Sequence, residues 1–254
     1  MDKHGLNPLR SMGQNFLIDK NVIEKMVSLV DPDSIVIEVG PGLGALTFPV
    51  ASVAKEVIAI EKDKKIAQIL EEEIASLKNV RVIKEDILKF NDLPNDYVVL
   101  SNLPFYITSI VIRKFLESNP QPKKMVLMLQ REVAKRICSL PPEMNLLALS
   151  VQFYAEPKIV FPVSKNSFWP RSDIDCSILT IENFKTKGDP ERFFRLARAG
   201  FSHPRAQLLN NLSNELRLDK DYIKTALSSL GIDPRRRAET LNLEEWLKLS
   251  QEIN

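Results

Sequence analysis

Short apolar runs alternate with stretches of helical periodicity through the first two-thirds of this chain. Such alternation is typical of a parallel sheet covered by helices. Five runs are interpreted as strands: Ser34–Val39, Glu56–Ile60, Val80–Ile83, Tyr97–Ser101 and Met125–Leu129. Between them, Leu46–Val53 and Lys64–Leu77 carry apolar residues at three-and-four spacing, as expected of helices packed on a sheet. The sequence therefore predicts a doubly wound α/β fold.

The pattern changes after the fifth run. Ser150–Tyr154 and Cys176–Ile181 are predicted to form an antiparallel pair that closes the sheet, with Phe161-Pro162 in a loop between them. Lys185–Pro190 is polar and indicates a linker. Beyond it only helical periodicity remains, in Glu191–Gly200, Ala206–Leu216, Lys220–Leu230 and Leu243–Glu252. We expect a domain over residues 1–184 and a small helical domain over 185–254.

Composition excludes several classes of protein. The two cysteines, Cys138 and Cys176, are far apart, and His4 and His203 are isolated, so neither a disulfide framework nor a metal centre is expected. No apolar run approaches the ~18 residues of a membrane span, and the first thirty residues do not resemble a signal peptide. We expect a soluble, cytoplasmic protein that does not bind membranes.

A glycine-rich segment follows the first predicted strand and points to a ligand. It reads Glu38-Val39-Gly40-Pro41-Gly42-Leu43-Gly44, where glycine lets the backbone approach a ligand closely. A dinucleotide site has the spacing G-x-G-x-x-G, but here the last glycine comes one residue early and an acid leads the loop. An acid disfavours a diphosphate and suits a cation. S-adenosylmethionine, with its ammonium and sulfonium groups, fits better than a nicotinamide cofactor.

Two further acids follow the next two strands. Glu61 ends the second strand, where its carboxylate can accept from both ribose hydroxyls. Asp86 follows the third strand and can take the amino group of the donor adenine, while Ile87 packs on the face of that ring. Ligands of such sheets bind at the carboxyl ends of the strands, so these side chains are expected to meet there.

The fourth strand runs into Asn102-Leu103-Pro104-Phe105, which suits a planar exocyclic amine. The Asn102 side chain can accept one N–H, and the Leu103 carbonyl, held extended by Pro104, can accept the other. The Phe105 ring can stack on the base that carries the amine. Taken alone, the same residues also fit an ordinary turn at a strand end.

Together these motifs resemble those of the ribosomal RNA adenine N6,N6-dimethyltransferases, the KsgA family. The resemblance extends from Ser11 to about Leu249 and includes Gly13–Leu17, the glycine loop, Leu129–Ala134 and Leu230–Pro234. It implies a Rossmann-like, class I S-adenosylmethionine-dependent methyltransferase sheet with a small C-terminal helical domain. The family dimethylates two adjacent adenines in a hairpin near the 3′ end of small-subunit (16S) rRNA, which implies a role in small-subunit biogenesis and the immature 30S subunit as partner.

The resemblance also assigns residues. Asn15 and Leu17 are expected to help hold the donor, with Gly40, Gly42, Glu61, Asp86, Ile87 and Asn102 completing its site. Asn102, Leu103, Pro104 and Phe105 are expected to grip the target adenine, and Phe168 to close over its other face. Ser172 and Cys176 stand where the family pattern has proline and serine, so the loop of Phe168 is expected to be less rigid.

Basic residues are unevenly distributed although the formal net charge is only +2. Two groups are candidates for phosphate contacts: one comprises Lys123, Lys124, Arg131, Lys135 and Arg136, and the other Arg235, Arg236 and Arg237. Either group also fits a solvated face. Their involvement predicts salt-sensitive RNA binding.

Three other functions stay open at this stage. The chain fits an RNA-binding assembly factor whose catalysis is incidental, a related large-subunit rRNA adenine N6-methyltransferase, or a nicotinamide-dependent oxidoreductase. Retention of Glu61, Asp86 and Asn102 favours catalysis, and the glycine spacing disfavours the oxidoreductase. A monomer is expected.

Overall fold

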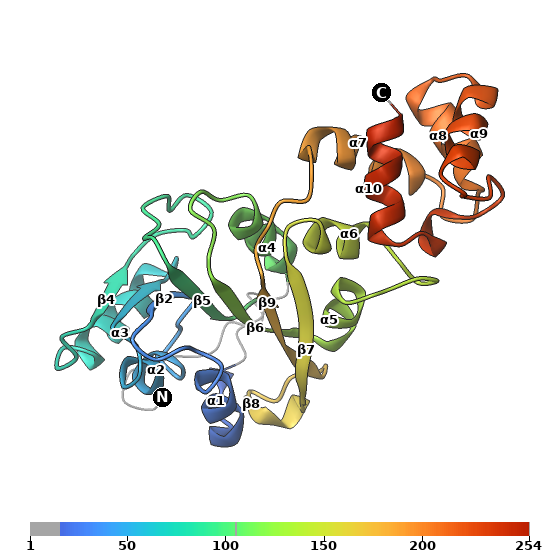
Figure 1. The fold of residues 1–254 in the computed structure, drawn as a ribbon. Helices are drawn as coiled ribbons and strands as arrows, with labels where there is room; N and C mark the ends of the chain where they lie inside the picture. The colour runs from blue at the N-terminus through green and yellow to red at the C-terminus, as the bar shows by residue number, and fades with distance from the viewer. Residues whose placement is uncertain (1–15, 105, 254) are drawn as a thin grey trace. The chain divides into compact units, whose positions relative to one another are not determined.

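The computed structural model describes residues 16–104 and 106–253 and divides into two compact units. The first contains the described chain up to Ala134 together with Lys158–Phe184. The second contains Lys135–Pro157 and the chain from Lys185 onward. Figure 1 labels the strands of the sheet and the helices of the C-terminal part.

A seven-stranded sheet forms the centre of the first unit. Its strands, in spatial order, are β4 (Val80–Ile83), β3 (Glu56–Ile60), β2 (Ile35–Val39), β5 (Tyr97–Asn102), β6 (Lys124–Gln130), β9 (Cys176–Glu182) and β7 (Glu156–Val163). The strands from β4 to β6 are parallel, and β9 runs antiparallel to β6. The chain builds outward from β2 in one direction and continues from β5 in the other (Figure 1). A ligand crevice is expected at this switch point between β2 and β5.

The doubly wound α/β architecture and six predicted strands are confirmed, but the closing pair was partly wrong. Residues Ser150–Tyr154 are not a strand: α6 (Leu146–Gln152) begins where the Asn145 side chain accepts the Ala148 N–H at 3.0 Å. The strand beside β9 is β7, which contains the Phe161-Pro162 pair expected in a loop. Proline is tolerated there because β7 lies at the edge of the sheet.

Helices α1 (Lys20–Val27) and α2 (Thr47–Ala51) pack with one face of the sheet. Val36, Val98 and Val126 of neighbouring strands share a core with Met26 and Val50 of these helices. The remaining helices of this part of the chain are α3 (Lys64–Glu73), α4 (Thr108–Leu116) and α5 (Arg131–Ile137). Asp19 and Asp63 cap α1 and α3, so each helix begins at a fixed residue beside the sheet.

A separate two-stranded ribbon pairs distant parts of the sequence. Strand β1 (Phe16–Leu17) runs antiparallel to β8 (Phe168–Trp169), with Leu17 opposite Phe168, and the short 3-10 helix η3 (Lys165–Ser167) precedes β8. The Ser167 hydroxyl donates to Asp19 Oδ2 at 2.9 Å. The ribbon therefore holds the start of the described chain against the segment that carries Phe168.

The second unit is helical, and its C-terminal helices match the predicted ones. They are α7 (Pro190–Gly200), α8 (Leu208–Leu216), α9 (Lys220–Ser229) and α10 (Leu243–Glu252), with the 3-10 helix η4 (Ala238–Thr240) before α10. This unit also takes in Lys135–Pro157, which the sequence assigned to the larger domain. The reason is packing: the rings of Phe153 and Phe193 lie 4.4 Å apart, and Lys185 N–H donates to the Tyr154 carbonyl at 2.7 Å.

No helix in residues 16–104 or 106–253 is long and apolar enough to cross a membrane.

Candidate functional site

A cavity of about 550 Å³ lies at the carboxyl ends of β2, β3, β4 and β5. Its volume is within the ordinary range for small-molecule sites. The sequence-predicted site residues that the structure describes all line it: Leu17, Gly40, Gly42, Glu61, Asp86, Ile87, Asn102, Leu103, Pro104 and Phe168. Asn15 and Phe105 lie outside the described residues. The fold thus brings together residues that are up to 151 positions apart, from Leu17 to Phe168.

The glycines of the loop after β2 have two different roles. Gly40 and Gly42 line the cavity with φ of +66° and +57°, a conformation that other residues adopt at a cost. Gly44 is needed for packing, since an added Cβ would lie 2.6 Å from Phe48 Cε2 and 2.9 Å from Leu70 Cδ1. Only the first two glycines therefore present backbone to a ligand.

Glu38 is buried at the end of β2 and also lines the cavity. The Thr47 hydroxyl donates to Glu38 Oε2 at 2.7 Å. Burial raises the pKa of Glu38 to about 7; the Thr47 hydrogen bond lowers this pKa, and the nearby charge of Glu61 raises it further. The side chain is thus poised to lose its proton when positive charge enters the cavity.

Glu61 is held by backbone donors at the end of β3. Its Oε1 accepts the Asp63 N–H at 2.9 Å, and its Oε2 accepts the Gly42 N–H at 3.3 Å. Burial raises the pKa of Glu61, against the effect of these hydrogen bonds. The bond to Gly42 links the carboxylate directly to the glycine loop, and each oxygen keeps lone pairs for a further donor.

Asp86 has an ionic partner that the sequence reasoning missed. Lys62 Nζ lies 2.9 Å from Asp86 Oδ2, and the Leu88 N–H donates to Asp86 Oδ1 at 3.0 Å. The hydrogen bond from Lys62 is the main cause that holds the pKa of Asp86 below its usual range. Lys62 directly follows Glu61 in the sequence, but nothing in that position alone indicates that its side chain reaches the end of the next strand.

The backbone around Asn102 is fixed on both sides. The Ser101 hydroxyl donates to the Val39 carbonyl at 2.5 Å, and the Leu103 N–H donates to the Met128 carbonyl at 3.1 Å. The Pro104 carbonyl accepts the Ile107 N–H at 3.1 Å, at the start of α4. Asn102, Leu103 and Pro104 therefore occupy set positions between the strands on either side and α4. Tyr106, which follows this motif, also lines the cavity and is 69% exposed, but no role in the site was assigned to it from the sequence.

The β1–β8 ribbon forms another wall of the cavity. Leu17 and Phe168 are both buried and line it, and Phe16 approaches the glycine loop, with its Cε1 3.5 Å from the Cβ that Gly42 lacks. The loop after Phe168 is held by Ser172, whose hydroxyl donates to the Ile174 carbonyl at 3.0 Å and whose N–H donates to the Lys165 carbonyl at 3.2 Å. Proline could not make the second bond, so these bonds offset part of the expected loss of rigidity.

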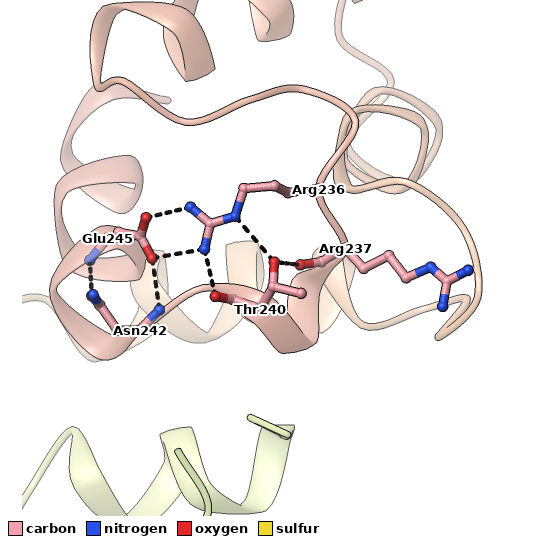
Figure 2. Close-up of polar contacts among 5 residues, drawn as sticks. All are labelled: Arg236, Arg237, Thr240, Asn242 and Glu245. Atoms are coloured by element: carbon pink, nitrogen blue, oxygen red, sulfur yellow. Dashed lines mark hydrogen bonds and ion pairs between the residues drawn. The ribbon is translucent and has the colours of Figure 1, made fainter. Parts of the chain in front are cut away.

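The basic clusters are largely engaged in internal ion pairs. Arg236 binds Glu245 at 2.5 Å and also contacts the side chain and carbonyl of Thr240 (Figure 2). Arg235 pairs with Asp233 at 2.9 Å, while Arg237 has only a longer contact of 3.7 Å to Glu239.

Figure 2 shows the Arg237 side chain pointing away from this network. Of the three adjacent arginines, Arg237 has the longest ion-pair contact.

The first basic cluster is also divided. Lys123 precedes β6 and Lys124 is its first residue, so both lie at the amino ends of the parallel strands, opposite to the cavity. Lys124 forms ion pairs with Asp31 at 3.2 Å and with Glu182 at 3.6 Å. Arg131 follows β6 at the cavity edge and pairs with Asp175 at 3.0 Å. Lys123 and Lys124 therefore lie away from the cavity, and their phosphate contacts stay a prediction.

The overall architecture is shared with two solved structures of RNA-modifying methyltransferases. A 23S rRNA methyltransferase, ErmE, is 23% identical with a TM-score of 0.78, over 94% of this chain and 99% of that one. A dimethyladenosine transferase from Plasmodium falciparum is 24% identical with a TM-score of 0.81, over 92% of this chain and 95% of that one. These likenesses confirm the predicted fold.

Comparison of amino-acid sequences identifies the family of this chain. Residues 6–254 match the family of ribosomal RNA adenine dimethylases. A ribosomal RNA small subunit methyltransferase A from Dehalococcoides mccartyi is 44% identical over 265 residues, 99% of this chain and 90% of that protein. One of the same description from Bacillus cytotoxicus is 36% identical over 273 residues, 100% of this chain and 94% of that protein. The chain belongs to the ribosomal RNA adenine dimethylase family.

The cavity fits the methyl donor of this family, S-adenosylmethionine. Its described lining includes the acids Glu38, Glu61, Asp63, Glu85 and Asp86, and Lys62 as the single base. Such a lining suits a ligand with an ammonium and a sulfonium and disfavours a diphosphate. The expectation of an S-adenosylmethionine-dependent enzyme is confirmed, and that of a nicotinamide-dependent oxidoreductase is set aside.

Proposed function

We propose that this protein transfers two methyl groups to N6 of each of two adjacent adenines in a hairpin near the 3′ end of small-subunit rRNA. It acts as a monomer in the cytoplasm on the immature 30S subunit and contributes to small-subunit biogenesis. The observation that carries the proposal is that Asn102, Leu103 and Pro104 line the same cavity as Glu61 and Asp86. The amine-holding motif and the acids suited to the donor are therefore within one site.

The donor-holding residues follow from the carboxylates and the glycine loop. Glu61 is proposed to accept from the ribose hydroxyls, and Asp86 from the adenine amine, with Ile87 against the ring face. Gly40 and Gly42 leave room for the methionine part, near the acid Glu38, and Asn15 and Leu17 cover the donor from the N-terminal side. When bound, S-adenosylmethionine supplies an electrophilic methyl group on its sulfonium.

The target amine needs positioning more than activation. Its nitrogen lone pair is delocalised into the adenine ring, so it is a weak nucleophile until it is aimed at the methyl carbon. The Asn102 side-chain oxygen and the Leu103 carbonyl each accept one N–H and hold the lone pair in line. As the new N–C bond forms, the nitrogen becomes acidic and releases its proton to water or a neighbouring acceptor. A neutral Asn102 is sufficient for this role.

The base must leave its stack to reach the cavity, at a cost of roughly a few kcal/mol. Phe105 and Phe168 are proposed to stack on its two faces and offset this cost. After the first transfer only one N–H remains, so dimethylation requires that one of the two acceptors tolerate a methyl group. Pro104 fixes the Leu103 carbonyl, so Asn102 is proposed to be the acceptor that yields.

The proposal is tested by separating methyl transfer from binding in an Asn102→Ala variant. We expect single-turnover transfer from labelled donor to undermethylated small subunits to fall by about 10²-fold or more, because the amine loses one of its two acceptors. Binding to the subunit is expected to persist. Unchanged transfer by Asn102→Ala would exclude the assigned role.

An assembly factor with incidental catalysis predicts another pattern. In that case wild-type protein binds the subunit but transfers methyl groups at a rate no higher than the variant. A preference for large-subunit RNA over small-subunit RNA in the same assay would support the large-subunit alternative.

A further inference from the structure

Lys62 has an unusual position in an acidic cavity. Among the described residues that line it, Lys62 is the only base and faces five acids. Its side chain is 74% exposed, yet its ammonium lies 2.9 Å from Asp86 Oδ2. The Lys62 ammonium thus pairs with Asp86, the acid that is proposed to accept the amine of the donor adenine.

Both oxygens of Asp86 are engaged in the structure. Oδ1 accepts the Leu88 N–H at 3.0 Å, and Oδ2 accepts from Lys62. The Leu88 bond belongs to the backbone of the segment after β4 and is fixed by the fold. The Lys62 bond belongs to a flexible, mostly exposed side chain that can move into water at little cost.

We propose that Lys62 competes with the adenine amine of the donor for Asp86, and so limits how tightly the cavity holds adenosine ligands. The inference rests on the proposed role of Asp86 as the adenine acceptor. A ligand amine that takes Oδ2 displaces the ammonium, which then turns toward solvent. Because the Lys62–Asp86 ion pair must be broken first, its free energy is lost from the binding free energy of every adenosine ligand.

Competition at Asp86 makes a prediction that a general charge effect does not. The displaced contact is at the adenine end, so removing Lys62 strengthens every ligand that carries adenosine by the same factor. A change in the overall field of the cavity instead favours S-adenosylmethionine, which carries a net positive charge, over neutral S-adenosylhomocysteine and adenosine. Comparison of the three ligands separates the two effects.

The test measures the dissociation constants of these three ligands by calorimetry for wild type and Lys62→Met. We expect the variant to bind all three about two- to fivefold more tightly, the range of a weak exposed ion pair. Lys65→Met is the matched control, because Lys65 is an exposed lysine of α3 that does not line the cavity. It removes the same charge and is expected to leave the three constants unchanged.

A double-mutant cycle with Asp86→Asn identifies the partner. In that background Lys62→Met is expected to give no gain, because the contact that it removes is already weakened. Equal or weaker binding by Lys62→Met, a gain confined to S-adenosylmethionine, or a full gain in the Asp86→Asn background would each overturn the inference.

Different results would exclude the role of Lys62 as competitor and the role of Asp86 as the acceptor of the adenine amine. If Asp86→Ala, which removes the acceptor, weakens all three ligands but Lys62→Met has no effect, only the role of Lys62 is lost. If Asp86→Ala binds as tightly as wild type, Asp86 does not hold the adenine, and both are lost.

Discussion

At the scale of single residues, Glu38 is a buried acid of the cavity whose pKa is raised well above its usual value. It is buried, accepts the Thr47 hydroxyl at 2.7 Å and has a pKa raised by burial to about 7. The sequence predicts an acid at the head of the glycine loop. Its burial and the Thr47 bond depend on the packing of α2 under β2, which the order of residues does not reveal.

The raised pKa of Glu38 makes folding stability depend on pH. Between its usual value of about 4.3 and about 7, the folded protein keeps a proton that the unfolded chain has lost, so stability decreases as pH rises. Full ionisation of Glu38 in the folded protein costs roughly 3–4 kcal/mol of stability. We expect the melting temperature of wild type, relative to Glu38→Gln, to decrease between pH 5 and pH 8 when measured without donor. A constant or increasing difference contradicts this pKa.

At the scale of helices and strands, sequence prediction depended on how local each signal is. The central strands are continuous apolar runs and α3 follows a capping aspartate, and these elements were predicted; α1 also follows a capping aspartate but was not among the predicted helices. Edge strand β7 was missed because Pro157 and Pro162 interrupt its pattern, although both fit an edge. The β1–β8 ribbon joins segments about 150 residues apart, a pairing that only the folded chain establishes.

Packing of α2 and α3 at the glycine loop gives a prediction at this scale. In Gly44→Ala the new methyl group would meet Phe48 and Leu70 at under 3.0 Å and add backbone strain at φ +86°. Gly40→Ala meets the strain alone, because nothing lies within 4 Å of its Cβ position. We expect Gly44→Ala to lose more stability in denaturant unfolding than the roughly 1–2 kcal/mol of left-handed strain expected for Gly40→Ala. Equal losses would contradict the packing role of Gly44.

The start of α10 provides a second test. Asn242 and Glu245 form a capping box, and Arg236 ties Glu245 to Thr240 (Figure 2). We expect Arg236→Met to destabilise the protein by about 1–3 kcal/mol, because it breaks several charge-assisted hydrogen bonds at half-buried side chains. Arg237→Met removes a neighbouring charge with one long contact and is expected to change stability by less than about 0.5 kcal/mol. Thermal melts of both variants test the difference.

At the scale of the whole molecule, the described residues of the predicted site line one cavity, whereas the two compact units have other bounds than the expected domains. Eight of the ten described site residues lie at the carboxyl ends of parallel strands, which meet at one edge, and Leu17 and Phe168 reach the same cavity from the β1–β8 ribbon. The boundary of the second unit was harder to place, since Lys135–Pro157 joins it through aromatic packing with α7. The sequence also did not reveal that Asp233 and Glu245 form ion pairs with Arg235 and Arg236, two of the candidates for phosphate contacts.

The proposed product of this protein is N6,N6-dimethyladenosine in small-subunit RNA, and its detection is the most direct test of the proposed function. Undermethylated small ribosomal subunits are incubated with isotopically labelled S-adenosylmethionine and the protein, and the nucleosides and RNA fragments are analysed by mass spectrometry. We predict labelled N6,N6-dimethyladenosine at two adjacent positions near the 3′ end, and no label in large-subunit RNA. Absence of label, label only as monomethyladenosine, or label in large-subunit RNA would contradict the account.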